Sequence, residues 1–92
     1  MYVKEPVRVA AATATIPCKH LLGIEAISGD VVVYKGSAAT AANKISSCTG
    51  AQGNRDYSDP ISVDSTPTSL GQNQIHVTVS GGTPEAIIYV SR

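Results

Sequence analysis

Short runs of β-branched residues, separated by turn-forming residues, constrain the fold of this chain more than any other feature. Residues 74–79, QIHVTV, alternate three aliphatic side chains with polar ones, which is the pattern of a half-buried strand. Residues 85–91, EAIIYVS, carry apolar side chains on both sides, which indicates a strand covered on both faces. The runs KHLLGIEAI at residues 19–27 and VVVYK at residues 31–35 are also typical of strands.

Two turns are expected to join these runs into β-hairpins. Gly29 and Asp30 stand between two of the runs, and a glycine supplies the positive φ that a tight hairpin turn requires. We therefore predict one hairpin over residues 21–35. The sequence SGGTP at residues 80–84 predicts a second hairpin, which joins the strands of residues 74–91.

Three further strands are expected elsewhere in the chain. They are residues 7–16 (VRVAAATATI), 44–48 (KISSC) and 60–64 (PISVD). The strand at residues 60–64 is expected because a structureless loop as long as residues 49–73 is rare in a compact domain. The rest of this polar stretch is predicted to form exposed loops. Residues 36–43, GSAATAAN, are predicted to form a tight connection, and one helical turn capped by Ser37 is the alternative.

The number and length of these strands predict the fold class. About six to eight short strands without a long helix are typical of a small antiparallel β-sandwich or a jelly-roll-like barrel. The 92 residues are enough for one domain. Residues 1–6 are expected to form an N-terminal arm, because Pro6 cannot donate a hydrogen bond to a central ladder. The single all-β sandwich domain then comprises residues 7–92.

The composition indicates a thin core and a weakly charged surface. The chain has no Phe, no Trp and one Met, so Ala, Val and Ile must fill the interior. Such a small domain needs stabilisation by a disulfide, a metal or assembly, and we favour assembly. Charged residues make up 15%, against about 25% in an ordinary soluble domain. The seven basic residues are scattered, so no nucleic-acid partner is expected.

The sequence predicts neither a membrane span nor a signal peptide. No apolar run approaches the roughly 18 residues that a membrane-spanning helix needs. Glu5, Pro6 and Arg8 interrupt the position where the apolar part of a signal peptide would lie.

Four residues suggest a zinc site: Cys18, His20, Cys48 and His76. They contain no C-x₂₋₄-C or H-x₃₋₅-H pair, so no metal site is predicted from them. A Cys18–Cys48 disulfide is an open alternative. Two buried, reduced thiols are favoured in a chain without an export signal.

Other site motifs are weak or missing. Asp56, Asp59 and Asp64 suggest calcium, but their spacing fits no EF-hand loop, and turn formation explains them more simply. No nucleophile elbow, phosphate-binding loop or dinucleotide fingerprint occurs in the sequence. We therefore predict no catalytic residue, no cofactor and no small-molecule substrate.

Four residues are candidates for a protein interface. Tyr2 and Val3 lie in the expected arm, Tyr57 lies in a polar loop, and Tyr89 lies in the last strand. Tyrosine is enriched at interfaces because one end of the side chain is apolar and the other is polar. A tyrosine ring lying over the rim of its own domain is the alternative.

The order of the segments also carries a family resemblance. LLGIEAISGDVVVYKGSAATAANKI, then DPISV, GQNQIHVTVSGG and AIIYVS, resembles the pattern of small β-sandwich head decoration, or cement, proteins of tailed bacteriophages. The resemblance covers roughly residues 21–91. It contains no catalytic or binding motif, so no functional residue is carried over.

The resemblance implies a non-enzymatic structural protein of the virion, assembled in the host cytoplasm. Such a protein binds the outer surface of the head and stabilises it against the pressure of the packaged DNA. The implied partners are the major capsid protein and further copies of the chain, often as trimers. A neck, tail-terminator or fibre-associated module is the second hypothesis, and a carbohydrate-binding module is the third.

Overall fold

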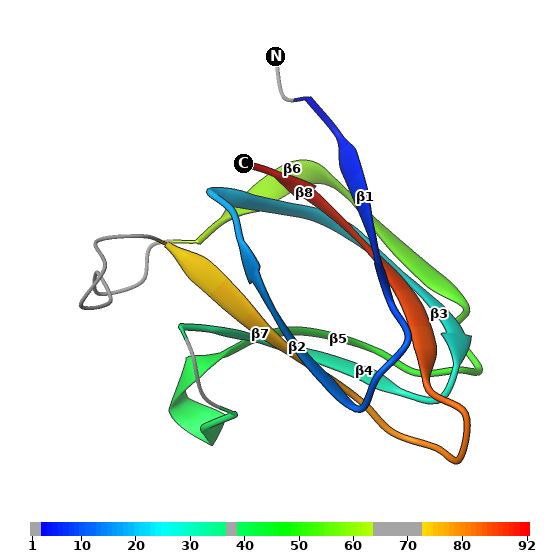
Figure 1. Cartoon of the computed structure of the whole chain (residues 1–92). Helices are drawn as coiled ribbons and strands as arrows, with labels where there is room; N and C mark the ends of the chain where they lie inside the picture. The colour runs from blue at the N-terminus through cyan, green and yellow to red at the C-terminus, as the bar shows by residue number, and fades with distance from the viewer. Residues whose placement is uncertain (1–2, 37–38, 64–72) are drawn as a thin grey trace.

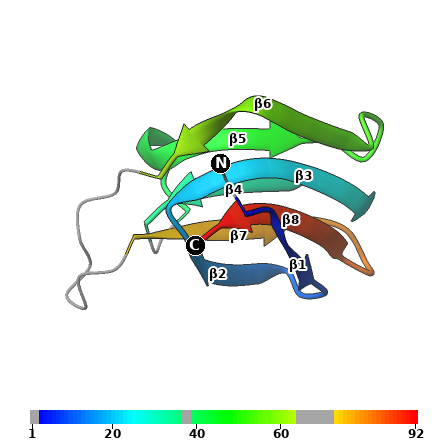
Figure 2. The same cartoon turned by 90° about the horizontal axis from the view of Figure 1, so that it is seen from above.

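The chain folds into two antiparallel sheets that face each other. The computed structural model describes residues 3–36, 39–63 and 73–92. Sheet A has the strand order β1-β8-β3-β6, and sheet B has the order β2-β7-β4-β5. The strands are β1 (Glu5–Val9), β2 (Thr13–Pro17), β3 (His20–Ser28), β4 (Val31–Lys35), β5 (Lys44–Cys48), β6 (Asn54–Ser62), β7 (Gln74–Val79) and β8 (Glu85–Ser91). Seen from above, β1 and β2 lie at one edge of the sandwich, and β5 and β6 lie at the other (Figure 2).

The strands pair in the order of a jelly roll. β1 pairs with β8, β2 with β7, β3 with β6 and β4 with β5, so the first half of the chain runs antiparallel to the second. The ladders β3–β8 and β4–β7 complete the two four-stranded sheets. The chain changes sheet between consecutive strands at every junction except β4–β5 (Figure 1). Eight strands with this connectivity form a double-sheet jelly roll, which confirms the predicted all-β class.

The core between the sheets consists of aliphatic side chains from alternating strand positions. In β7, Ile75, Val77 and Val79 face inward, while His76 and Thr78 face outward. The buried core residues are Val9, Ile16, Cys18, Leu21, Ile24, Ala26, Val31, Val33, Cys48, Val63, Ile75, Val77, Val79, Ala86, Ile88 and Val90. Each fully buried Val, Ile or Leu stabilises the fold by about 1.5–3 kcal/mol. The buried cluster itself contains no aromatic residue, and the partly buried Tyr57 packs against it.

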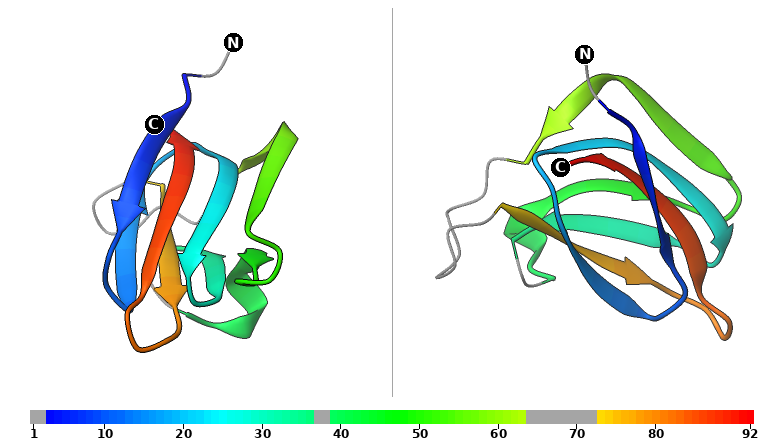
Figure 3. Two further views of the ribbon diagram at one scale, coloured as in Figure 1. Left: turned by 90° about the vertical axis from the view of Figure 1, so that its right-hand side faces the viewer. Right: turned by 45° about the horizontal axis from the view of Figure 1, so that its top comes forward.

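Both predicted hairpins are wrong, because each turn carries the chain from one sheet to the other. β3 and β4 belong to different sheets, and so do β7 and β8 (Figure 3). Glycine in a tight turn fixes the local backbone, but it does not decide whether the flanking strands bond to each other. The turns expected within residues 21–35 and 74–91 are therefore corners of the sandwich.

The two corners stack on each other at one end of the molecule. The Ser80 backbone N–H donates to the Asp30 carbonyl (2.9 Å), and the Asp30 backbone N–H donates to the Ser80 hydroxyl (3.1 Å). The Asp30 carboxylate also accepts a hydrogen bond from the Gly50 N–H (2.8 Å). Gly29 has a φ of 97°, and a β-carbon on it would lie 1.7 Å from the Ser80 carbonyl oxygen. Only glycine permits this approach.

The N-terminal segment differs from its prediction in two ways. The single strand expected over residues 7–16 is divided into β1 and β2 by a corner at residues 10–12, which moves the chain from sheet A to sheet B. The arm expected over residues 1–6 is shorter, because Glu5 and Pro6 belong to β1. Proline is tolerated there because β1 is an edge strand that pairs with β8 alone.

β6 begins earlier than expected. The prediction placed a strand at residues 60–64, but β6 starts at Asn54, inside a segment predicted to be a loop. This edge strand is mostly exposed, so no apolar alternation marks it in the sequence. A register shift opposite Leu21 and Gly23 also interrupts its pairing with β3.

The remaining strand predictions are close to the structure. β4, β5, β7 and β8 have the predicted bounds, and β3 is displaced by one residue. The connection between β4 and β5 contains a short 3-10 helix, η1 (Ala41–Asn43). The alternative cap Ser37 lies outside the described residues. Within the described part of the chain, no helix has the length and hydropathy to cross a membrane.

Replacing Gly29 by Ala tests the contact between the two corners. We expect Gly29→Ala to lower the free energy of unfolding by about 3 kcal/mol or more, because backbone must move away from backbone. Gly53→Ala is the matched control: Gly53 also has a positive φ, of 78°, but nothing lies within 4 Å of its added β-carbon. That variant should lose only about 1–2 kcal/mol. Urea unfolding measures both, and equal losses would contradict the close contact.

Candidate functional site

The outer surfaces of the two sheets differ sharply in charge. We call the outward residues of sheet B the B face, and those of sheet A the A face. The B face consists of Thr13, Thr15, Pro17, Val32, Tyr34, Lys44, Ser47, Gln74, His76 and Thr78. The A face includes the charged residues Lys4, Arg8, Glu25, Asp56 and Glu85. The B face therefore contains one formal charge, on Lys44 at the β5 edge.

Hydroxyl, aliphatic and aromatic side chains form the centre of the B face. Val32 on β4 lies between Thr78 on β7 and its β5 partner Ser47. The rings of Tyr34 and His76 lie beside Val32 and Thr78, with 6.3 Å between the ring centroids. All five side chains are half-buried.

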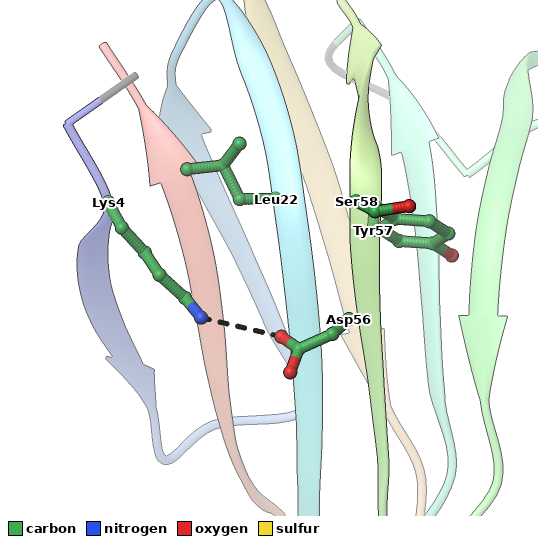
Figure 4. Close-up of a pocket in the computed structure, with 5 residues that line it drawn as sticks. All are labelled: Lys4, Leu22, Asp56, Tyr57 and Ser58. Atoms are coloured by element: carbon green, nitrogen blue, oxygen red, sulfur yellow. Dashed lines mark hydrogen bonds and ion pairs between the residues drawn. The ribbon is translucent and has the colours of Figure 1, made fainter. Parts of the chain in front are cut away.

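The Lys4 side chain lies across the A face. Its ammonium group is 4.6 Å from the ring centroid of Tyr89 on β8 and 3.4 Å from the Asp56 carboxylate on β6. Gly23 on β3 lies between them, and a β-carbon there would be 2.8 Å from the Arg55 carbonyl oxygen. The missing side chain at Gly23 thus permits both the close approach of β6 and the contact between Lys4 and Asp56 (Figure 4).

A shallow pocket of about 460 Å³ opens beside this ion pair. Its lining residues are Lys4, Leu22, Asp56, Tyr57 and Ser58 (Figure 4). Leu22 is only 7% exposed, yet it is not part of the core cluster, because the β3 register shift turns it to the outer side of the sheet. Leu22 gives the pocket an apolar surface, and beside it the charges of Lys4 and Asp56 neutralise each other. This arrangement contains no nucleophile activated by a base.

Three of the four predicted interface residues are described by the structure, and they lie in different surroundings. Tyr2 lies outside the described residues. Val3 is 78% exposed, and Tyr89 lies on the A face beneath Lys4. Tyr57 points between the sheets, packs against the core and shares a hydrogen bond between its hydroxyl and that of Ser46. The tyrosines of β6 and β8 therefore lie on different sides of sheet A.

The cysteine and histidine residues do not form a metal site. Cys18 and Cys48 are buried free thiols, and no disulfide joins them. In the part of the chain that the structure describes, no group of three or more His, Cys, Asp or Glu residues is placed to hold a metal ion. Of the suggested calcium ligands, Asp56 pairs with Lys4, and Asp64 lies outside the described residues.

Burial changes the acidity of one of these thiols. It raises the pKa of the Cys18 thiol from 9.0 to about 11, and the positive charge of Arg92 opposes part of this rise. The thiolate is the reactive form of cysteine, so Cys18 is a poor nucleophile and a poor metal ligand at neutral pH.

Sequence reasoning missed the B face and the position of Leu22. The signal for the B face was present, because Thr78, His76 and Val32 are the alternate residues of correctly predicted strands. Leu22 carried no such signal. Its outward position depends on a shift in pairing between β3 and strands that are distant in the sequence.

The hydrogen bond between Tyr57 and Ser46 links the edges of the two sheets. Tyr57→Phe should lower the free energy of unfolding by about 1–2 kcal/mol, because the buried Ser46 hydroxyl loses its partner. Ser46→Ala in the same background should then cost little more, which gives a coupling energy of about 1 kcal/mol in a double-mutant cycle. Tyr34→Phe on the B face is the control. Additive losses in urea unfolding would show that the two hydroxyls do not interact.

The raised pKa of Cys18 predicts a loss of stability in alkali. The unfolded chain releases this proton near pH 9, whereas the folded chain keeps it until about pH 11. The contribution to stability is therefore complete below pH 9 and is lost as the pH rises to about 11. Other groups titrate in this range too, so the informative comparison is with Cys18→Ala. Urea unfolding at several pH values should show a steeper alkaline decline in the unmodified protein, and parallel curves would contradict this assignment.

No protein-family model, curated protein or solved structure matches the chain.

Proposed function

We propose that this chain is a non-enzymatic structural protein of a tailed-bacteriophage virion. In this proposal it binds the outer surface of the capsid as a decoration, or cement, protein and stabilises the head against the pressure of packaged DNA. Its partners are the major capsid protein and further copies of itself, as trimers or another homo-oligomer on the shell. Assembly takes place in the host cytoplasm.

The charge-poor B face is the observation that carries the proposal. Charged residues are depleted at the centre of protein interfaces, because a buried charge without a partner costs several kcal/mol. Val32, Tyr34 and Thr78 offer a half-buried apolar and hydroxyl surface without a charge at its centre. The A face, with its five charged side chains, suits contact with water. We therefore assign the B face to the shell.

The core and the fold class add support of a more general kind. A core of Val, Ile, Leu and Ala leaves a small stability margin for a chain of this length, and association of folded copies with a partner increases it. Weak contacts repeated over a lattice also sum to a firm attachment. Jelly rolls occur in viral capsid proteins and in lectins, so the fold is compatible with the proposal without selecting it.

The carbohydrate-binding alternative has less support from the arrangement of tyrosines. Sugar rings stack on aromatic side chains that share one face, but Tyr34 lies on the B face, Tyr57 points between the sheets, and Tyr89 lies on the A face. A neck, tail-terminator or fibre-associated role would use the same B face. Copy number separates that role from decoration, because it is hundreds per particle for a head protein and tens or fewer for a tail part.

Binding to capsids that lack a decoration protein tests the proposal. The purified chain should bind such capsids with a saturable stoichiometry that matches their symmetry, and it should raise the temperature at which they disrupt. Quantitative electrophoresis of sedimented particles gives the stoichiometry, and light scattering during heating gives the stability. Failure to bind any tailed-phage head would overturn the proposal.

A pair of matched variants tests the B face itself. Val32→Lys places a charge at the centre of the B face and should weaken capsid binding at least about tenfold. Ile87→Lys is the control, since Ile87 is a half-buried outward residue on an inner strand of the A face. It should bind within about twofold of the unmodified protein. The reverse pattern would place the docking surface on sheet A.

A further inference from the structure

All three ion pairs found among the described residues attach the N-terminal segment, residues 4–9, to the rest of the sandwich. They are Lys4–Asp56 (3.4 Å), Arg8–Glu85 (3.1 Å) and Glu5–Arg92. Their side chains are between 32% and 75% exposed. Ion pairs at such exposure stabilise weakly and are screened by salt. Much of the side-chain attachment of this segment therefore consists of ion pairs, which salt can weaken.

The apolar contribution to the same attachment is small. Within β1, Val9 is buried and Val7 is half-buried, while Arg8 is exposed. Pro6 has no N–H to donate to the β1–β8 ladder. β1 is also an edge strand, so β8 is its one ladder partner. β1 is therefore held by few buried side chains, by one ladder and by exposed ion pairs.

The corner that follows β1 has no residue that requires a turn. Residues 10–12 are all alanine, and no described residue other than glycine has a positive φ. The sequence predicts one strand over residues 7–16 because β-branched residues recur in the same period-2 phase on both sides of these alanines, at 7 and 9 and again at 13 and 15. Residues 5–17 can therefore straighten into one continuous strand without backbone strain.

We propose that β1 exchanges between two copies of this chain. In the exchanged dimer, residues 10–12 are extended and β1 of each copy pairs with β8 of the other. Val9 fills the same place in the partner's core, and the ion pairs of Lys4 and Arg8 re-form between copies. Because the contacts of the closed and exchanged forms are the same, the corner and the protein concentration set the balance between them.

The acceptor surface selects a second copy as the occupant. The N-terminal segment carries a positive, a negative and a positive charge, on Lys4, Glu5 and Arg8. The acceptor surface offers the complementary charges in the same order, on Asp56, Arg92 and Glu85. An unrelated strand would have to reproduce this order together with an inward aliphatic residue at the position of Val9. The exchange does not depend on the proposed capsid role.

Cross-linking between differently tagged copies tests the exchange. Arg8 and Ile87 are direct partners in the β1–β8 ladder, so Arg8→Cys in one copy and Ile87→Cys in another become neighbours only after exchange. After equilibration at high concentration, a short bis-maleimide should join the two tags into a covalent heterodimer. The native thiols of Cys18 and Cys48 are buried and react slowly.

The other edge strand at this side of the sandwich provides the control. Thr13 on β2 and Thr78 on β7 are also direct partners, one exposed and one half-buried. β2 is joined to strands of sheet A at both of its ends, so straightening the corner at residues 10–12 does not release it. A mixture of Thr13→Cys and Thr78→Cys chains should give at least about tenfold less heterodimer. Equal cross-linking in the two mixtures would overturn the proposal.

The corner is expected to set the dimer fraction at equilibrium, and the ion pairs are expected to set the rate of exchange. Deletion of Ala11 should raise the dimer fraction in size-exclusion chromatography with light scattering, and insertion of two glycines after Ala11 should lower it about tenfold.

Raising salt from about 0.01 M to about 1 M should speed exchange about tenfold, because salt screens the ion pairs that must break before β1 can leave its own copy. The equilibrium dimer fraction should change little with salt. A dimer fraction insensitive to both corner variants would also overturn the proposal.

Discussion

The contact between Gly29 and Ser80 holds together the inner strands of both sheets. The corners at these residues connect β3 to β4 and β7 to β8, and these four strands form the central ladders β3–β8 and β4–β7. The stacked corners bring the ends of both ladders together at one end of the molecule. The approach is close enough to exclude a β-carbon at Gly29. The outer strands β1, β6, β2 and β5 pair on either side of this central framework.

The positions of five of the eight strands, β3, β4, β5, β7 and β8, could be predicted closely from the sequence, but the partners of the strands could not. Alternation along residues 74–79 or 44–48 is a local property, and it identified β7 and β5 with their observed bounds. A glycine turn makes a hairpin or a corner according to which strands pair with the two strands that it joins. Those partner strands are distant in the sequence, so the residues around Gly29 do not determine the outcome. β6 was underestimated for a related reason: an exposed edge strand has no apolar face to produce a pattern.

The same distinction applies to the surface. The outward residues of correctly predicted strands, such as Val32 and Thr78, follow from alternation, so the composition of the B face was implicit in the sequence. The A face was not, because Lys4 reaches Asp56 across a gap left by Gly23, and Leu22 turns outward at an irregularity in pairing. Contacts of this kind join residues far apart in the chain and require the strand order to be known first.

The two proposals draw on physically separate parts of the molecule. The B face depends on the absence of charge at the centre of sheet B, around Val32, whereas exchange of β1 depends on ion pairs at the edge of sheet A and on the corner at residues 10–12. Straightening that corner moves β1 alone and leaves the four strands of sheet B paired as before. A copy can therefore present an intact B face whether or not its β1 is exchanged. If both properties hold, exchange would link neighbouring copies through sheet A while sheet B stays free for the shell. Binding to the shell would then add the stability that exchange, which leaves the contacts unchanged, does not.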